Sequence, residues 1–584
     1  MNNKIILTDA FKYNNIDQDK ILPPEETVKQ FKEKLKKIDL DLLQDTVRID
    51  NGRLDIPVYF SICGNDAYAL TGTRKQMGKG GTTQQAEASA VMELAERFSL
   101  FSFRNNPENF LFEKYRNIKD KAIPFKMIAQ SVNDDSDNLE IAEKIFEGIH
   151  FKWTKAFNLT QNKEILIPFD WFFTINEFNG ACAGNCVEEA ISQGMCEVVE
   201  RHVSSIISHK KLRIPLINAD SVTDPMVVEL IKKYRNAGVK LYISDFSLQT
   251  GIPTVGVLAY DPLTFPKTSE IVWTAGTTLN PQKSLSRALT EAAQLAGDFN
   301  TGSNYVASGL PKFKGIEEAE FVINPRNEPE NKIDIKNLPD LSDNNIKVEI
   351  ENCISSLKEK GMEVIVINTM NQKLEIPAFY TIIPGAHFRE RALENSVCMF
   401  AAKHIANTYD PETAVFKLQN IENILPEKYY IKFYLGSCHL AMNNLKTALT
   451  CFTKSLELEP ANQDKPSIYS YMGVCLKDMG EYHNAISALM KGEKHDSERT
   501  DIYNSMGFCY FKLKEHEKAI DCFKKVLQIN PGSAIDYANI ASNYCEMGKP
   551  IKAIQYYKTA LSIDPGIDFA KDNMEKLLTI NQAS

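Results

Sequence analysis

The sequence lacks the features that mark several specialised classes of protein. No apolar run approaches the roughly 18 residues of a membrane-spanning helix, and residues 1–9 hold no apolar stretch of signal-peptide length. Basic residues are fewer than acidic ones, 67 against 76, and the formal net charge is −9. Non-specific nucleic-acid binding relies on clustered positive charge. We therefore expect a cytoplasmic protein that binds neither a membrane nor nucleic acid.

The common metal-binding and nucleotide-binding motifs are also missing. The twelve cysteines form no CxxC pair and the nine histidines no HExxH motif, so zinc sites and histidine-based hydrolysis have no visible support. Neither a G-x-x-x-x-G-K-[ST] loop nor a G-x-G-x-x-G turn occurs. We interpret the cysteines as reduced residues of the core. A redox role for Cys182 and Cys186 stays open.

What is present indicates a folded chain of more than one domain. A chain of 584 residues is too long for one ordinary core, and 43% hydrophobic with 24% charged residues is normal for a globular protein. Residues 1–390 mix helical and strand patterns, which favours an α/β or α+β domain. Residues 325–345 read as a loop, and residues 391–428 as a mostly helical linker.

The local patterns in the first domain predict specific elements. Helices are expected at 27–38, 86–103, 188–208, 225–237, 284–297 and 347–360. Strands are expected at 240–244, 254–260, 363–368 and 378–383.

Residues 429–580 contain an internal repeat. Small residues recur, and each is followed twelve residues later by alanine and four residues after that by a large apolar residue: Gly436, Ala448 and Phe452; Gly473, Ala485 and Leu489; Gly507, Ala519 and Phe523; Ala541, Ala553 and Tyr557. This pattern looks like four tetratricopeptide repeats over about 429–565, closed by a capping helix at 568–580. It predicts an all-α solenoid. Such arrays bind peptides or proteins or mediate self-association; the alternative is that this one only docks on the rest of the chain.

Three expected helices carry polar residues at steps of three and four, which places them on one helical face. The motifs are Ser89, Glu93, Glu96 and Arg97; then Asn185, Glu189, Gln193, Glu197, Glu200 and Arg201; then Arg287, Glu291 and Gln294. The first two share a constant offset of 104 residues, as from Glu93 to Glu197, which indicates two similar helices side by side. Three amphipathic helices with solvated charged faces would be the simpler interpretation.

The chemistry of the set favours another interpretation. Carboxylates drawn together raise one another's pKa, and divalent cations remove that conflict. Oxygen-rich clusters suit Mg²⁺, which also binds phosphate oxygens, and the guanidinium fork matches phosphate. The residues alone therefore indicate a Mg²⁺-nucleotide site on a helical platform.

At these motifs the sequence resembles the YcaO family of ATP-dependent enzymes that modify backbone amides. Neighbouring segments agree: Ile56–Tyr59, Gly78–Thr82, Ala183–Asn185, Gly276–Thr278 and Ile383–Gly385. The resemblance covers roughly residues 15–390. It implies a YcaO-like ATP-binding domain, with ATP and Mg²⁺ as cofactors, ahead of the repeat solenoid.

The resemblance also implies roles for particular residues, although it assigns no catalytic acid or base. The expected metal ligands are Glu93, Glu96, Glu197, Glu200 and Glu291. The expected nucleotide contacts are Ser89, Arg97, Asn185, Glu189, Gln193, Arg201, Arg287 and Gln294. Lys20 and Thr27 match a basic residue and a hydroxyl of the family; otherwise they are a surface lysine and a helix N-cap. Lys79, in a glycine-rich loop, is a weaker phosphate candidate.

The implied reaction is amide activation. A nucleophile adds to a backbone carbonyl of a peptide or protein substrate, the oxyanion attacks the γ-phosphate of ATP, and phosphate leaves with the former carbonyl oxygen. A substrate Cys, Ser or Thr side chain gives an azoline, and external sulfide gives a thioamide.

Two departures favour a non-azoline member, either a thioamide-forming enzyme or an accessory in protein modification. The chain ends at Ile580–Ser584 without a Pro-rich tail, and we expect no leader-binding domain at its front. The resemblance implies a TfuA-type or sulfur-donor partner protein and a homodimer. An azoline-forming cyclodehydratase is the alternative within the family. A nucleotide-binding adaptor acting through its repeats is the alternative of another class; a side-chain kinase lacks any catalytic-loop pattern.

Overall fold

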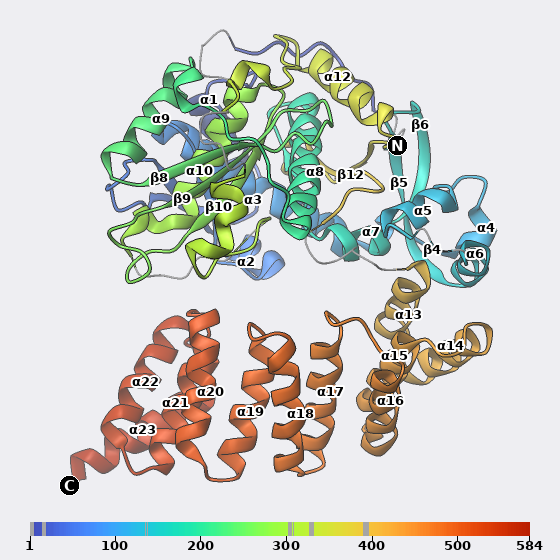
Figure 1. The fold of residues 1–584 in the computed structure, drawn as a ribbon, viewed down its shortest axis with the longest axis vertical. Coiled ribbons are helices and arrows are strands. Elements are labelled where there is room, and N and C mark those ends of the chain that lie inside the picture. The colour runs from blue at the N-terminus through green and yellow to red at the C-terminus, as the bar shows by residue number, and fades with distance from the viewer. Residues whose placement is uncertain are drawn as a thin grey trace. The chain divides into compact units, whose positions relative to one another are not determined.

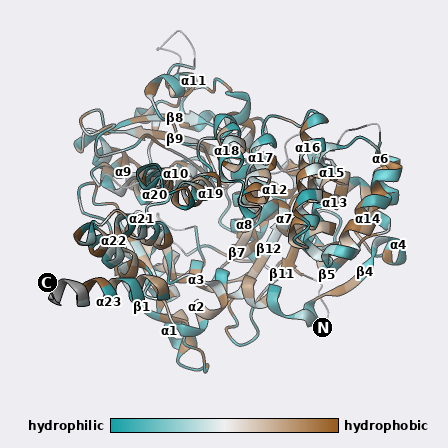
Figure 2. Ribbon diagram, turned by 90° about the horizontal axis from the view of Figure 1, so that it is seen from below, coloured by the Kyte–Doolittle hydropathy of each residue, from teal (hydrophilic) through white to brown (hydrophobic). Residues whose placement is uncertain are grey.

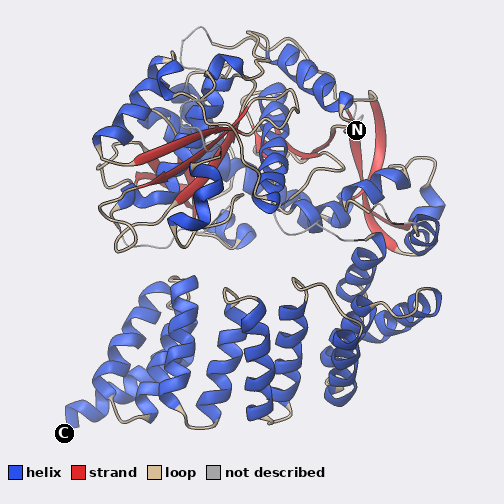
Figure 3. Cartoon of the chain, in the orientation of Figure 1, coloured by secondary structure: helices blue, strands red, loops and turns tan. Residues whose placement is uncertain are grey.

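The computed structural model describes residues 5–13, 19–134, 136, 138–301, 307, 309–325, 332–388 and 396–583. The chain divides into two compact units, Met1–Val397 and Cys398–Ser584. Every strand of the described part belongs to the first unit, and the second unit is built from helices (Figures 1 and 3). Among the described residues, no helix combines the length and the apolar character that crossing a bilayer requires.

The first unit is mixed α and β. Its helices are α1 (Pro24–Leu35), α2 (Asn65–Thr71), α3 (Thr83–Asn105), α4 (Tyr115–Ile118), α5 (Phe125–Ser131), α6 (Leu139–Glu147), α7 (Phe169–Asn176), α8 (Val187–Lys210), α9 (Pro225–Asn236), α10 (Pro281–Ala296), α11 (Glu320–Ile323) and α12 (Ile346–Glu359). Its strands are β1 (Leu43–Arg48), β2 (Val58–Cys63), β3 (Lys75–Lys79), β4 (Leu111–Lys114), β5 (His150–Asn158), β6 (Lys163–Pro168), β7 (Ala181–Ala183), β8 (Lys240–Asp245), β9 (Thr254–Tyr260), β10 (Val272–Thr277), β11 (Ile365–Asn368) and β12 (Ala378–Ile382).

The strands form three antiparallel sheets. Two have three strands each, in the orders β1-β2-β3 and β10-β9-β8. The third has the order β4-β5-β11-β12-β7, with β6 also paired to β5. Because β9 and β10 are buried along their whole length, they read as continuous apolar runs rather than alternating ones.

Helix packing on these sheets explains the apolar sides of the motif helices. One core cluster joins α10 to β9 and β10 through Leu289, Val257 and Val272. Another joins α1 to α3 through Phe31 and Leu94. The apolar faces of α3 and α10 are therefore buried in the core, and their polar faces do not contribute to it.

Local capping sets where the three motif helices begin. The Thr82 hydroxyl accepts a hydrogen bond from the Gln85 N–H, and Oε1 of Gln85 accepts one from the Thr82 N–H. At α8 the Cys186 Sγ accepts from the Glu189 N–H, and at α10 the Asn280 side chain accepts from two backbone N–H groups. These caps define the first turns of α3, α8 and α10, and so the positions of the polar residues on each helix.

The predicted elements of the first unit correspond to α1, α3, α8, α9, α10 and α12 and to β8, β9, β11 and β12, with ends that differ by three residues at most. The helix predicted to begin at Thr27 begins at Pro24, so the N-cap interpretation of Thr27 is wrong. Its hydroxyl donates to the Pro23 carbonyl inside the first turn, 3.3 Å away. Residues 326–331 of the predicted loop and residues 391–395 of the predicted linker lie outside the described residues.

The second unit is a series of helices: α13 (Val397–Thr408), α14 (Pro411–Ile424), α15 (Tyr429–Ala441), α16 (Leu445–Glu457), α17 (Lys465–Asp478), α18 (Tyr482–His495), α19 (Thr500–Lys512), α20 (His516–Ile529), α21 (Ala534–Glu546), α22 (Pro550–Ile563) and α23 (Asp568–Ala583). The predicted four helix pairs are α15–α16 to α21–α22, and α23 follows them. The ribbons of these helices carry both teal and brown residues, as expected for amphipathic helices (Figure 2).

The repeated glycines permit the close approach of paired helices. A Cβ at Gly436 would lie 2.6 Å from the Phe452 ring, and one at Gly507 would lie 2.7 Å from the Phe523 ring. Phe452 also packs on Ile468 and Cys475 of the next repeat. The small residue therefore makes room for the aromatic ring within one repeat, and the ring packs against the next repeat.

Candidate functional site

The predicted site residues line one cavity of about 680 Å³ in the first unit. All sixteen are present in its wall: Lys20, Thr27, Lys79, Ser89, Glu93, Glu96, Arg97, Asn185, Glu189, Gln193, Glu197, Glu200, Arg201, Arg287, Glu291 and Gln294. They come from α1, α3, α8, α10, β3 and the segments that precede α1 and α8. The structure thus brings together every residue that the motifs singled out.

Shared strands hold the three motif helices around this cavity. α3 and α8 both pack on β7 and β12, and α8 and α10 both pack on β10. β3 completes the ring, since α3 lies along it and α10 contacts it. The two glutamate motifs offset by 104 residues therefore lie on helices that share two strands.

On α3 the charges pair within one turn. Arg97 donates from Nε and Nη2 to Oε1 of Glu93, at 2.9 and 2.7 Å. Its Nη1 lies 3.5 Å from Oε1 of Glu96. The guanidinium also covers the ring of Phe178, with 4.8 Å between Cζ and the ring centroid. Burial, followed by the charges of Glu93 and Glu197, raises the pKa of Glu96 well above its usual value.

On α8 two carboxylates are held by backbone groups and stand beside a loosely paired arginine. Oε2 of Glu197 accepts from the Gly180 N–H at 3.2 Å, and Oε2 of Glu200 accepts from the Thr277 N–H at 3.0 Å. Arg201 lies 3.8 Å from Glu197 and 3.9 Å from Glu200, beyond hydrogen-bond distance. Burial raises the pKa of Glu197, and burial with the charge of Glu291 raises the pKa of Glu200 to about 7.

α10 faces both neighbouring elements. Nη1 of Arg287 donates to Oε1 of Gln193 on α8 at 2.6 Å. Glu291 forms an ion pair with Lys79 at the end of β3. Lys79 is the last residue of β3 rather than part of the glycine-rich loop predicted for it, so the strand places it beside the carboxylate cluster.

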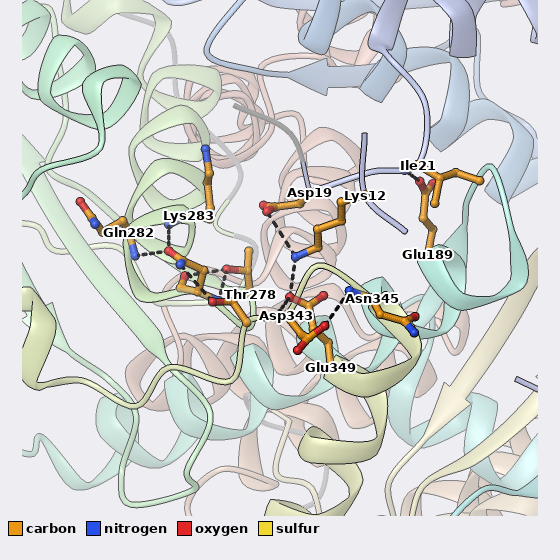
Figure 4. A network of polar contacts seen from close by, with 12 residues as sticks. Lys12, Asp19, Ile21, Glu189, Thr278, Gln282, Lys283, Asp343, Asn345 and Glu349 are labelled. Carbon is orange, nitrogen blue, oxygen red and sulfur yellow. Dashed lines mark hydrogen bonds and ion pairs between the residues drawn. The ribbon is translucent and has the colours of Figure 1, made fainter. Parts of the chain in front are cut away.

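The N-terminal segment closes one side of the site. Glu189 accepts from the Ile21 N–H at 2.5 Å and from the Asn185 side chain at 3.0 Å. Earlier in the same N-terminal segment, Lys12 pairs with Glu349 of α12 and lies 3.8 Å from Asp19 (Figure 4). Glu189 thus anchors the segment that carries Asp19 and Lys20 to the cavity wall, which is a structural role beside the predicted nucleotide contact.

The donor groups fit a nucleotide with Mg²⁺. Nη1 of Arg97 and Nε of Arg201 are buried and form no hydrogen bond in the described part of the chain. Unpaired guanidinium N–H groups in a cavity match phosphate oxygens. No three Asp, Glu, His or Cys residues of the described segments converge into a ready-made metal cage. Mg²⁺ usually binds through one or two carboxylates together with substrate phosphates, so this set fits a metal ion that arrives with a nucleotide.

Several cavity residues escaped the sequence analysis. Lys283 stands four residues before Arg287, so the same helical spacing could have included it. Phe60, Gln76 and Met77 lie on β2 and β3. The sequence VYFSIC of β2 is typical of a strand and could have been found. Which residues of β2 and β3 face the cavity depends on their pairing and on the packing of α3, which the sequence does not show.

The cysteines provide no reactive thiol at this site. All twelve are free. The Cys182 thiol donates to the Phe379 carbonyl at 3.2 Å, and burial raises its pKa. Burial also raises the pKa of Cys186 to about 12. A protonated thiol is a poor nucleophile, so the arrangement favours the interpretation of these cysteines as structural.

Comparison with known families gives two kinds of match. A family model described as YcaO cyclodehydratase, ATP- and Mg²⁺-binding, matches residues 77–387, just over half of the chain. Tetratricopeptide-repeat models match residues 431–462, 500–533 and 537–567. The predicted mixed α and β domain and its C-terminal repeats are both confirmed.

Curated relatives share parts of the chain. An uncharacterized protein of Methanothermobacter thermautotrophicus is 28% identical over 382 residues, which cover 62% of this chain and 93% of that protein. The ribosomal protein S12 methylthiotransferase accessory factor YcaO of Escherichia coli is 33% identical over 104 residues, 18% of each chain. An uncharacterized protein in the tfuA 3′ region of Rhizobium leguminosarum bv. trifolii is 24% identical over 259 residues, 41% of this chain and 58% of that protein.

Two solved structures are similar to about two thirds of this chain. A heterocyclase in complex with substrate and cofactor has a TM-score of 0.54 at 21% identity, over 66% of this chain and 54% of that one. YcaO from Methanopyrus kandleri, bound with AMPPCP and Mg²⁺, has a TM-score of 0.48 at 21% identity, over 65% of this chain and 95% of that one. The first of these supports the fold.

Proposed function

Because the chain belongs to the YcaO family, whose cofactors are ATP and Mg²⁺, we propose that it activates a backbone amide of a peptide or protein by phosphorylating the amide oxygen. One observation carries this proposal. Residues from three separated motifs line a single cavity, and two of their arginines hold buried N–H groups without a hydrogen-bond partner in the described structure. That arrangement suits a polyphosphate better than it suits a solvated surface.

The chain's own residues divide into two groups by charge. Arg97, Arg201 and Arg287 are proposed to bind phosphate oxygens, with Lys79 beside them. The five glutamates of the motifs are the proposed Mg²⁺ ligands, with one or two of them on any one ion: Glu93, Glu96, Glu197, Glu200 and Glu291. When bound, ATP with Mg²⁺ supplies the phosphoryl group that converts the amide oxygen into a leaving group. Preorganised charges around that transfer stabilise its transition state because they need not reorganise.

For the nucleophile we favour external sulfide, which gives a thioamide, over a substrate side chain, which gives an azoline. In this scheme hydrosulfide adds to the amide carbon, the former carbonyl oxygen leaves as phosphate, and loss of the S–H proton completes the C=S bond. Two relatives support this choice by their names, one from a tfuA region and one an accessory factor of a methylthiotransferase. The repeats of the second unit are proposed to hold the substrate or a partner such as a TfuA-type protein.

Calorimetry with ATP and Mg²⁺ tests the nucleotide site. The wild type should bind ATP only when Mg²⁺ is present. Glu200→Gln should weaken that binding at least tenfold, because it removes a carboxylate from the cavity wall. Glu229→Gln, an equal charge change on the exposed side of α9, serves as the matched control. Equal affinity in Glu200→Gln and Glu229→Gln would exclude a metal-binding role for Glu200.

Mass spectrometry of a modified substrate distinguishes the two chemistries. Replacement of oxygen by sulfur raises the mass of the modified residue, whereas azoline formation removes one water. ATP binding without any turnover, with substrate and sulfur donor present, would instead support a nucleotide-binding adaptor.

A further inference from the structure

One edge of the three-stranded sheet β1-β2-β3 is open, and it borders the cavity. The register pairs Phe60 with Met77 and Ile62 with Lys75, and the Cys63 N–H bonds the Arg74 carbonyl at 2.9 Å. In an antiparallel ladder hydrogen-bonded and non-bonded pairs alternate. The backbone N–H and C=O groups of Lys75, Met77 and Lys79 therefore point away from β2.

These outward groups are free of other backbone partners in the described part of the chain. No hydrogen bond joins the backbone of Lys75, Met77 or Lys79 to any other residue in the described part of the chain. Lys75 is exposed, and Met77 and Lys79 are half-buried. An unpaired strand edge is a ready template for another strand.

The edge bounds the cavity rather than lying elsewhere on the sheet. The Gly78 side of β3 packs on α3, since a Cβ at Gly78 would lie 2.1 Å from the Ala90 nitrogen. Side chains alternate along a strand, so Gln76 shares that side while Met77 and Lys79 occupy the other. Gln76, Met77 and Lys79 all line the cavity. Residues from both faces of β3 can line one cavity only where the cavity meets the edge.

The opposite edge of the same sheet is blocked. On β1 the outward N–H of Thr46 bonds Oδ1 of Asp45 at 2.8 Å. Arg48 binds Asp50 and Asp55. Charged edge residues commonly prevent strand addition. On β3, however, Lys75 lies over the Phe60 ring at 4.0 Å and Lys79 pairs with Glu291, so both ammonium groups already contact other side chains.

We infer that β3 binds the substrate as an added strand: an extended peptide pairs with the backbone of Lys75, Met77 and Lys79. This inference rests on the proposed function. The edge spans about 14 Å from Lys75 to Lys79 and ends at the Lys79–Glu291 pair, so it guides the peptide backbone to the nucleotide site. Main-chain pairing supplies affinity without selecting side chains, which suits an enzyme that acts on a backbone amide.

Met77→Pro tests the inference. It removes one outward N–H and leaves the β2–β3 ladder intact, since proline is tolerated at outward edge positions. The matched control is Thr46→Pro, at the blocked edge. The probe is an equimolar library of N-acetylated, C-amidated heptapeptides with randomised positions, supplied with ATP, Mg²⁺ and hydrosulfide, and the readout is phosphate release from ATP. In the wild type and Thr46→Pro the library should stimulate release; in Met77→Pro the stimulation should fall at least tenfold.

Hydrogen exchange on the wild type makes the test independent of whether Met77→Pro folds. With ADP and Mg²⁺ present throughout, the peptide library should slow exchange of the Lys75, Met77 and Lys79 amides and leave the Thr46 amide unchanged. Absence of that protection, or equal stimulation in Met77→Pro and Thr46→Pro, overturns the inference. A wild type that fails to bind ATP in calorimetry refutes the proposed function itself, whereas ATP binding without edge protection refutes only the added strand.

Discussion

Lys79 and Glu291 form an ion pair although 212 residues separate them in the chain. Lys79 ends β3, and Glu291 lies on α10. Both side chains are largely buried, with 20% and 12% of their surface exposed. The pair therefore joins the first sheet to the third motif helix at the wall of the cavity, and it places one cation among the carboxylates before any ligand binds.

The first prediction concerns this pair. Glu291→Gln should weaken binding of ATP with Mg²⁺ at least tenfold, because the variant loses a proposed metal ligand and leaves Lys79 without its partner carboxylate. A tenfold change corresponds to about 1.4 kcal/mol. Calorimetry measures it, with Glu229→Gln as the control for charge. Unchanged affinity in Glu291→Gln would show that the carboxylate serves the ion pair alone.

The second prediction concerns the packing of α3 on β3. In Gly78→Ala the new Cβ would lie 2.1 Å from the Ala90 nitrogen and 2.4 Å from the Ala86 carbonyl oxygen, both backbone atoms of α3. The helix must move, which should cost about 1–3 kcal/mol of stability and weaken ATP binding by displacing Glu93. Gly148→Ala is the control, since its nearest atom is 3.5 Å away. Urea unfolding and calorimetry together check both effects; a stable Gly78→Ala variant with normal ATP affinity would contradict the prediction.

The third prediction concerns pH. Burial acts to raise the pKa of Asp261, but the Arg53 guanidinium and the Leu263 N–H outweigh it and hold the pKa below its usual value. A depressed folded pKa stabilises the fold above the unfolded pKa, about 3.9, and this stability is lost as pH falls through the folded pKa.

Asp261→Asn should therefore cost about 3 kcal/mol at neutral pH, since it breaks an ion pair whose carboxylate is fully buried. The difference in urea midpoint between the variant and the wild type should shrink as pH falls below about 4. Asp220→Asn, at a carboxylate that is 78% exposed, should shift the midpoint little at either pH. A difference that stays constant with pH would disprove the linkage.

The sequence predicted the polar stripes of the site better than the sheets around it. Steps of three and four along a helix are local, so Glu93, Glu197 and Glu291 could be placed on helical faces without knowing the fold. Strand pairing is not local. β3, with the sequence KQMGK, shows no clear alternation, and only its pairing with β2 and its packing on α3 make it a strand. Met77 was missed for that reason.

The repeats could be predicted because their contacts are local. A period of about 34 residues is visible in the sequence alone, and each repeat contacts its neighbours only.

Two errors on helices had local causes. Lys283 was missed, although its spacing to Arg287 could have identified it. Thr27 was misplaced because the chain places Pro24 at the first helical position, where proline is favoured.

The last prediction separates the stabilities of the two units. Phe452 is fully buried against Ala448, Ile468 and Cys475, so Phe452→Ala should destabilise the second unit by about 3–5 kcal/mol.

All three tryptophans, Trp153, Trp171 and Trp273, lie in the first unit. Tryptophan fluorescence therefore follows the first unit, whereas far-UV circular dichroism follows the helices of both. In Phe452→Ala the circular dichroism transition should gain an early phase, and the fluorescence midpoint should stay unchanged. Phe416→Ala, at a phenylalanine of α14 that is 64% exposed, should leave both transitions in place. If Phe452→Ala lowers the fluorescence midpoint as much as the circular dichroism midpoint, the two units unfold as one cooperative body.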